Sequence, residues 1–429
     1  MYKIISSIKL IGIIGIFLWI SFFAPLVGGQ YQSLFLIFIT SLLLVLLILN
    51  NRLYKIMLDK KDLPLWIFLF SMIGGIVNIQ NPSIAYWHFW GFIFPIPFLY
   101  FFAKAVFEER CNLLILRSMC LVGLIVCLYG IIEFIPNQNF IYRDLVSNLY
   151  YVSFKGRRMM ATHIHPAPLG TYLVAIFPLA IVSILKEKKI FFKSLAIISV
   201  LIIFISIILT FSRGAFLGAF TAMSIILFFV CRRNRRVFTP LLILLAVVII
   251  AVSSFLCHYG YDYFYRFGFQ GVSSTFIYTA KIGRFISIWG ILKDHPLFGL
   301  GLGHYRVFFD YYLPHLASVT SQTSKVPDCM YIALLTETGL IGFAGFVLFI
   351  SFLFKSIWHK LKLVSGYEDR LLIVGFLSGF VGVLVAFLTY DGDLTPLTCT
   401  NSYVRIQVTE RGKNEEEKVQ SRTNCCYAA

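Results

Sequence analysis

The stretch IFFKSLAIISVLIIFISIILTFSRGAFLGAF, residues 190–220, decides the fold class of this chain. Its first part, 190–211, is apolar over a length that crosses a hydrocarbon core of about 30 Å, which takes about 20 helical residues. Arg213 follows almost at once, and a second apolar run occupies 214–231. The pattern predicts two membrane-spanning helices joined by a short hairpin that carries an arginine. A permanent charge is costly next to a hydrocarbon core, so we expect Arg213 to have a binding partner or a function there.

The composition of the whole chain indicates a membrane protein. Of its 429 residues, 59% are hydrophobic and only 13% are charged, whereas soluble domains carry about 25% charged residues. The net charge of +17 would also fit a nucleic-acid-binding protein. However, most Lys and Arg stand in short loops between apolar runs, where membrane topology accounts for them. We therefore expect the bilayer, and no nucleic acid, as a partner. The cysteines show no CxxC or Cys/His ligand spacing, so no metal site is expected.

The apolar runs predict an all-α integral membrane protein of about 11–12 transmembrane helices. Eleven runs can be drawn, at 10–27, 34–49, 63–78, 86–107, 113–135, 169–185, 190–211, 214–231, 238–257, 331–354 and 370–390. The first run follows Lys3 and Lys9 as a signal peptide would. It lacks a clear small-x-small cleavage site, so we predict that it is retained as a span.

The loop charges predict the orientation. Each even-numbered run is followed by a basic loop, which places these loops and the N-terminus in the cytoplasm. The long segments 136–168 and 258–330 then lie on the outer side, and loops of this length are usually functional. Within the second segment, four apolar residues at helical spacing predict a short amphipathic helix at the membrane interface. These residues are Phe285, Ile288, Trp289 and Leu292.

The predicted organisation has six parts. They are N-terminal transmembrane helices (1–135), a first long outer loop (136–168), central transmembrane helices with the Arg213 hairpin (169–257), a large outer loop (258–330), C-terminal transmembrane helices (331–390) and an atypical polar tail (391–429). One hypothesis for the tail is a truncated or frame-altered end that has lost a final span.

Arginines on the predicted outer side break the trend of positive charge inside. They include Arg157, Arg158, Arg213, Arg266, Arg284 and Arg306. The planar guanidinium fork matches phosphate oxygens, so several converging arginines suit an anionic ligand such as a lipid-linked pyrophosphate. For Arg213, snorkelling to lipid headgroups or capping of a helix end is the alternative interpretation.

Three further groups in the outer segments have more than one interpretation. His163 and His165 could form a metal pair, but no third ligand is evident, and interfacial histidines bonded to backbone are the favoured reading. The turn GLGLG, 299–303, could bring backbone near phosphate, although it follows no Rossmann strand and is a weak signal. Gly214 and Gly218 form a GxxxG spacing that favours close helix packing.

Four blocks of the chain together resemble the bacterial O-antigen polymerase and O-antigen ligase family of membrane glycosyltransferases. They are RRMMATHIHPAPLGTYL (157–173), LTFSRGAF (209–216), GRFISIWGILKDHPLFGLGLGHY (283–305) and PDCMYIALLTETGLIG (327–342). The resemblance implies a GT-C-like, lipid-dependent enzyme of the bacterial cytoplasmic membrane, whose outer loop covers the active site. It further implies transfer of a glycan from an undecaprenyl-pyrophosphate donor to a sugar hydroxyl, with no nucleotide sugar, metal or other cofactor. A chain-length regulator and a flippase are the implied partners.

The resemblance also implies roles for single residues. Arg213 and Arg284 match arginines that would hold the donor diphosphate, and Arg158 and Arg306 are further candidates for the same ligand. Preplaced cations of this kind stabilise the charge that grows on a departing diphosphate.

Two carboxylates are candidate catalytic residues. Family ligases carry a histidine at the place of Asp328, so an aspartate there looks more like the polymerase branch. Asp328 could be the acceptor-side base or a helix N-cap. Glu337 lies about two turns into the predicted span 331–354, where it either has a function or forms an internal salt bridge.

The favoured function is polymerisation of lipid-linked oligosaccharide repeat units on the outer leaflet, which makes O-antigen, capsule or another exopolysaccharide. A ligase that moves finished glycan to a lipid A core is the nearest alternative, and a flippase is the alternative from another class. Transporters tend to contain repeats and helices interrupted near the midplane. Here the unusual residues gather in outer loops and at span ends, which favours a surface reaction.

Overall fold

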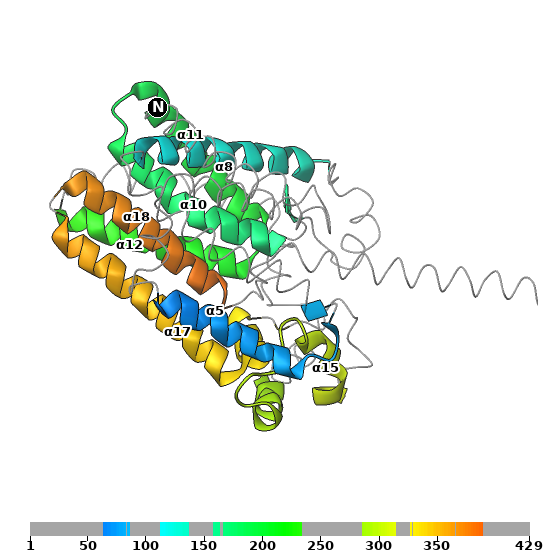
Figure 1. Cartoon of the computed structure of the whole chain (residues 1–429). Coiled ribbons are helices and arrows are strands. Elements are labelled where there is room, and N and C mark those ends of the chain that lie inside the picture. The colour runs from blue at the N-terminus through cyan, green and yellow to red at the C-terminus, as the bar shows by residue number, and fades with distance from the viewer. Residues whose placement is uncertain are drawn as a thin grey trace, which may run out of the picture.

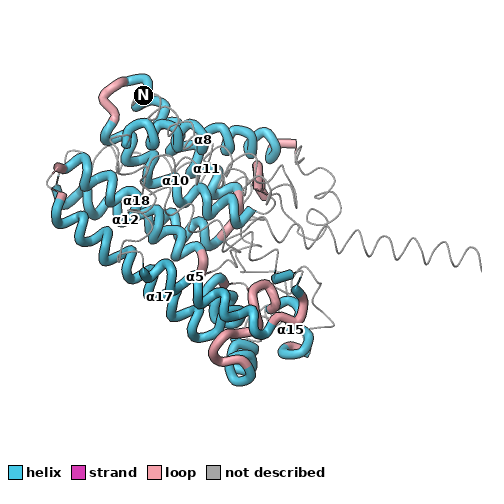
Figure 2. The backbone as a smooth tube through the Cα atoms, viewed as in Figure 1, coloured by secondary structure: helices cyan, strands magenta, loops and turns pink. Residues whose placement is uncertain are grey.

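A computed structural model describes residues 63–82, 84–85, 112–136, 158–163, 166–233, 285–314, 327, 329–364 and 366–388. These ranges consist of helices joined by loops and turns and contain no strand (Figure 2). Six of the described helices are long and apolar enough to cross a membrane. The predicted all-α membrane fold is therefore confirmed in the described part of the chain.

Described helices from the predicted N-terminal, central and C-terminal parts form one helix bundle (Figure 1). Its members are α8 (Asn112–Phe134), α10 (Pro166–Lys186), α11 (Ile190–Leu209), α12 (Arg213–Arg233) and α18 (Tyr367–Ala386). Each lies within a few residues of a predicted apolar run. The predicted spans 10–27, 34–49, 86–107 and 238–257 lie outside the described residues, as does the tail 391–429.

Close backbone contacts hold α18 against its neighbours in the bundle. A Cβ atom on Gly218 would lie 2.3 Å from the carbonyl oxygen of Gly382, and one on Gly379 would lie 2.7 Å from that of Ala175. Lipid tails are as apolar as the helices, so association in a membrane depends on such tight van der Waals contact. The packing role predicted for Gly218 is confirmed.

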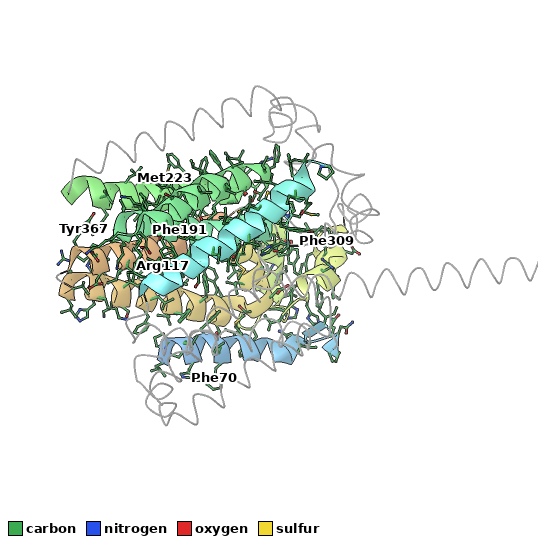
Figure 3. All side chains as sticks on the ribbon, turned by 90° about the horizontal axis from the view of Figure 1, so that it is seen from above. Phe70, Arg117, Phe191, Met223, Phe309 and Tyr367 are labelled. Carbon is green, nitrogen blue, oxygen red and sulfur yellow. The ribbon has the colours of Figure 1, made fainter. Side chains whose placement is uncertain are left out.

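The helix α17 (Met330–Leu363) packs beside α5 (Leu63–Ile73), as Figure 1 shows. Phe68 of α5 and Phe346 of α17 bring their rings to 5.7 Å between centroids. Phe70, on the outward face of α5 in Figure 3, is 67% exposed, as expected for a side chain that meets lipid. The predicted run 63–78 is an α-helix only to Ile73. The rest of the run forms the 3₁₀ helix η3 (Gly74–Asn78).

The helices share two common ends. At one end the carboxylate of Glu187 lies 2.6 Å from Nε of Arg117, which is labelled on α8 in Figure 3. At the opposite end the N–H of Met330 donates to the carbonyl of Phe387, 3.2 Å away. Arg213 begins α12 at this second end, because Gly218 and Gly382 are in contact five residues further into each helix. We call the end that carries Arg213, Met330 and Phe387 the outer end, after the side on which the loop charges predict it.

Candidate functional site

The hairpin between α11 and α12 is built as a tight, capped turn. Phe211 adopts a left-handed backbone conformation with φ of 51°, which lets the chain reverse within three residues. The Ser212 hydroxyl accepts the N–H of Ala215 at 3.4 Å and so caps the start of α12. The N–H of Met159 donates to the carbonyl of Leu209 at 2.9 Å, which lays the segment 158–163 against the turn.

The Arg158 guanidinium binds this hairpin directly. Its Nε donates to the carbonyl of Thr210 at 3.0 Å, and its Nη2 donates to that of Phe211 at 3.3 Å. Carbonyls at a helix C-terminus lack partners within the helix and carry its negative pole, so a cation is favoured there. Arg158 therefore caps the C-terminus of α11 and brings a second positive charge to the hairpin of Arg213.

Arg213 is exposed at the first position of α12. The N-terminus of a helix is its positive pole, where a cation is disfavoured and an anion is stabilised. Arg213, the pole of α12 and the neighbouring Arg158 thus concentrate positive charge at one place of the outer end. That arrangement suits an anion with several oxygens.

His163 is buried beside the hairpin. Its ring packs on the ring of Tyr172 at 5.4 Å between centroids, and its Nδ1 lies 3.4 Å from the Thr162 hydroxyl. Burial away from water lowers the pKa of His163 to about 4. His163 is therefore a neutral packing residue near pH 7, and its predicted partner His165 lies outside the described residues.

Two helices of the large outer loop form what we call the outer platform, residues 285–314. The first helix covers 285–294, and α15 follows at Tyr305–Tyr312. Ile291 and Phe309 belong to their shared apolar core, and the Tyr312 hydroxyl donates to the Asp294 carboxylate at 2.9 Å.

The predicted amphipathic helix at 285–292 is confirmed as a helix. Within its apolar stripe, Phe285 is 64% exposed and Trp289 76% exposed, while Ile288 and Leu292 are half-buried. This exposure fits a helix whose apolar face meets a membrane interface.

The loop between these two helices is inserted into the hydrogen-bond ladder of α17. Gly339 leaves helical geometry, with φ of 66° and ψ of −167°. The N–H groups of Leu340 and Ile341 therefore donate to the carbonyls of Pro296 and Leu297, at 2.9 and 3.2 Å. An unbroken helix would use these donors for the carbonyls four residues earlier.

Those carbonyls of α17 are also satisfied by the loop. The Thr336 carbonyl accepts the N–H of Leu300 at 2.9 Å, and the Glu337 carbonyl accepts that of Gly301 at 3.0 Å. Four hydrogen bonds to the loop thus replace two within the helix. We call this arrangement the splice.

The Glu337 side chain adds a further connection beside the splice. Its Oε2 accepts the N–H of Gly303 at 2.9 Å, and its Oε1 accepts that of Tyr305 at 3.3 Å. These donors are at the start of α15, where N–H groups lack helical partners and favour an acidic group. The cost of placing a carboxylate here is therefore offset by backbone amides.

Arg306 is the residue after Tyr305, in the first turn of α15, and its side chain is half-exposed. Among the predicted site residues, Arg158 binds the hairpin that carries Arg213. Arg306 lies on the outer platform, directly after Tyr305, whose N–H Glu337 accepts.

Several predicted site residues cannot be placed. Arg284 and Asp328 lie outside the described residues, as do Arg157 and Arg266. Arg284 precedes the helix 285–294 directly in the sequence, and Asp328 precedes Cys329, the residue before α17.

The patterns in the sequence do not predict the splice. The glycines of the turn 299–303 are a weak signal for phosphate binding, whereas in the structure the backbone of this turn contacts α17 and η3. The Asn78 side chain donates to the carbonyl of Gly299 at 2.7 Å. Nε2 of the buried His304 accepts the N–H of Asn81 at 3.1 Å. The available signal in the sequence is the four glycines themselves, because Gly299, Gly301, Gly303 and Gly339 all adopt positive φ angles in the structure.

Part of the chain matches a known protein family. Residues 197–347 match the family described as O-antigen ligase. This range runs from α11 through the Arg213 hairpin and the outer platform to the splice in α17. Members of the family are membrane enzymes that transfer glycans, in the class of ligases and polymerases of lipid-linked glycans. The search of curated proteins gave no match. Residues 197–347 of the chain are therefore similar to the O-antigen ligase family.

Proposed function

We propose that the chain polymerises undecaprenyl-diphosphate-linked oligosaccharide repeat units on the outer face of the bacterial cytoplasmic membrane. The observation that carries the proposal is the Arg158–Arg213 hairpin at the outer end. There, a solvent-exposed arginine stands at the positive pole of α12, against the preference of the helix dipole. A diphosphate bound at this place would gain from both arginines and from the pole.

The proposed reaction needs little beyond charge and orientation. The oxygen of an acceptor sugar hydroxyl attacks the anomeric carbon of the donor glycan, and a new glycosidic C–O bond forms. The bond from that carbon to the diphosphate breaks, and its electron pair leaves with undecaprenyl diphosphate. The hydroxyl proton passes to a base, which we assign to Asp328. Arg213 and Arg284, with Arg158 and Arg306, stabilise the charge that develops on the leaving diphosphate.

The ligase alternative differs only in the acceptor. Its hydroxyl would belong to a lipid A core rather than to another lipid-linked repeat unit. Asp328 favours the polymerase, because family ligases are expected to carry histidine at that place. A flippase would move the lipid-linked glycan without breaking a glycosidic bond.

Purified protein in detergent, supplied with synthetic undecaprenyl-diphospho-oligosaccharide, tests the proposal. We expect longer glycans and released undecaprenyl diphosphate, separated by gel and by mass spectrometry. Transfer to added lipid A core without lengthening would favour the ligase. Movement across liposomes without either product would favour the flippase.

Variants test the site itself. Arg213→Ala and Arg284→Ala should each lower the rate by about 100-fold or more, the usual loss when one stabilising donor of a developing anion is removed. Lys188→Ala, an exposed cation at the opposite end of the bundle, is the matched control and should retain the rate. Full activity of both arginine variants, or reporter fusions that place residues 213 and 284 in the cytosol, would overturn the assignment.

A further inference from the structure

We propose that Glu337 is a positioning residue, which holds the start of α15 and thereby fixes Arg306 at the outer end. The inference rests on the proposed function for the role of Arg306. The anchoring itself rests on the contacts of the Glu337 side chain alone.

The carboxylate contacts the two amides that bracket the start of α15. Gly303 and Tyr305 donate to different oxygens of the same carboxylate, at 2.9 and 3.3 Å. Arg306 follows Tyr305 directly, so its backbone is held within one residue of the anchor. A shift of this carboxylate would therefore move the arginine.

The splice keeps the anchor in place. Glu337 stands between Thr336 and Thr338, which are both fully buried. Its own carbonyl accepts the N–H of Gly301. The backbone and the side chain of Glu337 thus both bind the turn 299–303.

This geometry favours a positioning role over proton abstraction. A general base needs an oxygen that can approach the acceptor hydroxyl, whereas each oxygen here already uses one of its lone pairs to accept a backbone N–H. An acceptor of hydrogen bonds can be replaced in part by an amide, because Gln keeps one carbonyl oxygen. A base cannot be replaced in this way.

The test compares Glu337→Gln with Glu337→Ala. A positioning role predicts a graded series, in which Gln raises the KM for the lipid-linked donor about 10-fold and lowers kcat less than about 3-fold, while Ala loses more of both. Glu368→Gln is the matched control, because Glu368 is an exposed carboxylate in the first turn of α18. This control should retain both constants.

Amide hydrogen exchange gives a readout that does not depend on activity. Peptides covering residues 299–312 should exchange faster in both Glu337 variants, while peptides from α10 should keep their protection. If Glu337→Ala fails to fold, loss of protection in α10 will show it, and Glu337→Gln then decides.

Coupling to Arg306 completes the test. If Glu337 acts through this arginine, Glu337→Gln should cost little further activity in an Arg306→Ala background. Equal loss of kcat in the Gln and Ala variants, with KM and exchange unchanged, would overturn the inference and indicate a base. Unaltered exchange would overturn it by itself. If the wild type transfers no glycan, the proposed function fails, and the exchange result alone decides whether Glu337 is the anchor.

Discussion

The backbone N–H of Leu340 donates to the carbonyl of Pro296, 2.9 Å away, although Thr336 stands four residues earlier in the same helix. The interruption leaves residues 340–363 of α17 as a continuous helix, which is about 36 Å long at 1.5 Å per residue. That length crosses a hydrocarbon core of about 30 Å without the residues before Gly339. The outer platform is thus joined to a membrane span by bonds that satisfy the N–H groups of Leu340 and Ile341 and the carbonyls of Thr336 and Glu337, as a low-dielectric environment favours.

Gly339→Ala should disrupt the splice. The backbone at Gly339 has φ of 66°, and an added Cβ would lie 2.4 Å from the carbonyl oxygen of Leu297 and 2.6 Å from the nitrogen of Gly299. Backbone atoms cannot rotate away, so we expect a loss of at least about 2 kcal/mol in stability. Thermal unfolding in detergent would measure it, together with glycan transfer.

The matched control is Gly366→Ala, before α18. Its φ is −69°, and a Cβ there would approach nothing nearer than the Asp369 carboxylate at 3.4 Å. This change should shift stability by less than about 0.5 kcal/mol. Equal effects of the two substitutions would show that the kink at Gly339 is not under this constraint.

Replacing Arg158 should destabilise the protein more than replacing Arg213. Arg158→Ala removes two hydrogen bonds to the end of α11 and should cost about 1–3 kcal/mol, because the donor is charged but half-exposed. Arg213→Ala changes an exposed side chain and should cost less than about 0.5 kcal/mol. Both should lose transfer activity.

Unfolding midpoints and transfer rates of the same preparations would test this separation. Arg158→Lys is the informative third variant, since an ammonium keeps the charge but not the planar fork. If Arg158→Ala leaves the stability unchanged, the hydrogen bonds of Arg158 with the hairpin make no net contribution to the free energy of unfolding.

The ion pairs at the end opposite the outer end should differ in strength. Glu187 is 1% exposed and binds Arg117 through both oxygens, at 2.6 and 2.9 Å. Lys186 and Asp369 are 3.9 Å apart, and the Asp369 side chain is 64% exposed. Glu187→Ala should therefore cost about 2–3 kcal/mol, and Asp369→Ala less than about 1 kcal/mol.

Added salt offers an independent check of these pairs. Screening acts mainly on exposed charges, so 0.5 M NaCl, about three times physiological ionic strength, should reduce the small effect of Asp369→Ala more than that of Glu187→Ala. A larger effect for Asp369 would contradict the ranking by burial.

The helices were predictable from sequence where length and hydropathy suffice. The run 190–211 and α11 agree because about 20 apolar residues in a bilayer can satisfy their backbone only as a helix. The break at Gly339 was not predictable in the same way. The run 331–354 is long enough to be one unbroken span, and the break is caused by a loop about 40 residues earlier in the chain.

The candidate site was predictable as a set of residue types and not as an arrangement. An arginine in an apolar hairpin points to an anion because of its charge, whatever its neighbours. That Arg158 binds the carbonyls of Thr210 and Phe211 depends on contacts across about 50 residues of chain. Likewise, the sequence does not reveal the amides at the start of α15 that bind Glu337, because every residue type except proline supplies such donors.

His163 should make the protein less stable in acid. Its pKa is about 4 in the folded protein and about 6.5 in an unfolded chain. As pH falls from 6.5 toward 4, the unfolded chain takes up a proton that the folded protein excludes, so stability falls by at most about 1.4 kcal/mol per pH unit. His163→Asn should therefore reduce the difference between the unfolding midpoints measured at pH 7.5 and at pH 5. These two values lie about 1 and about 1.5 pH units on either side of the pKa of histidine in an unfolded chain. His359→Asn, which changes an exposed histidine in α17, should leave that difference as it is in the wild type. If His163→Asn also leaves it unchanged, the acid sensitivity comes from other groups and the His163 ring is open to water.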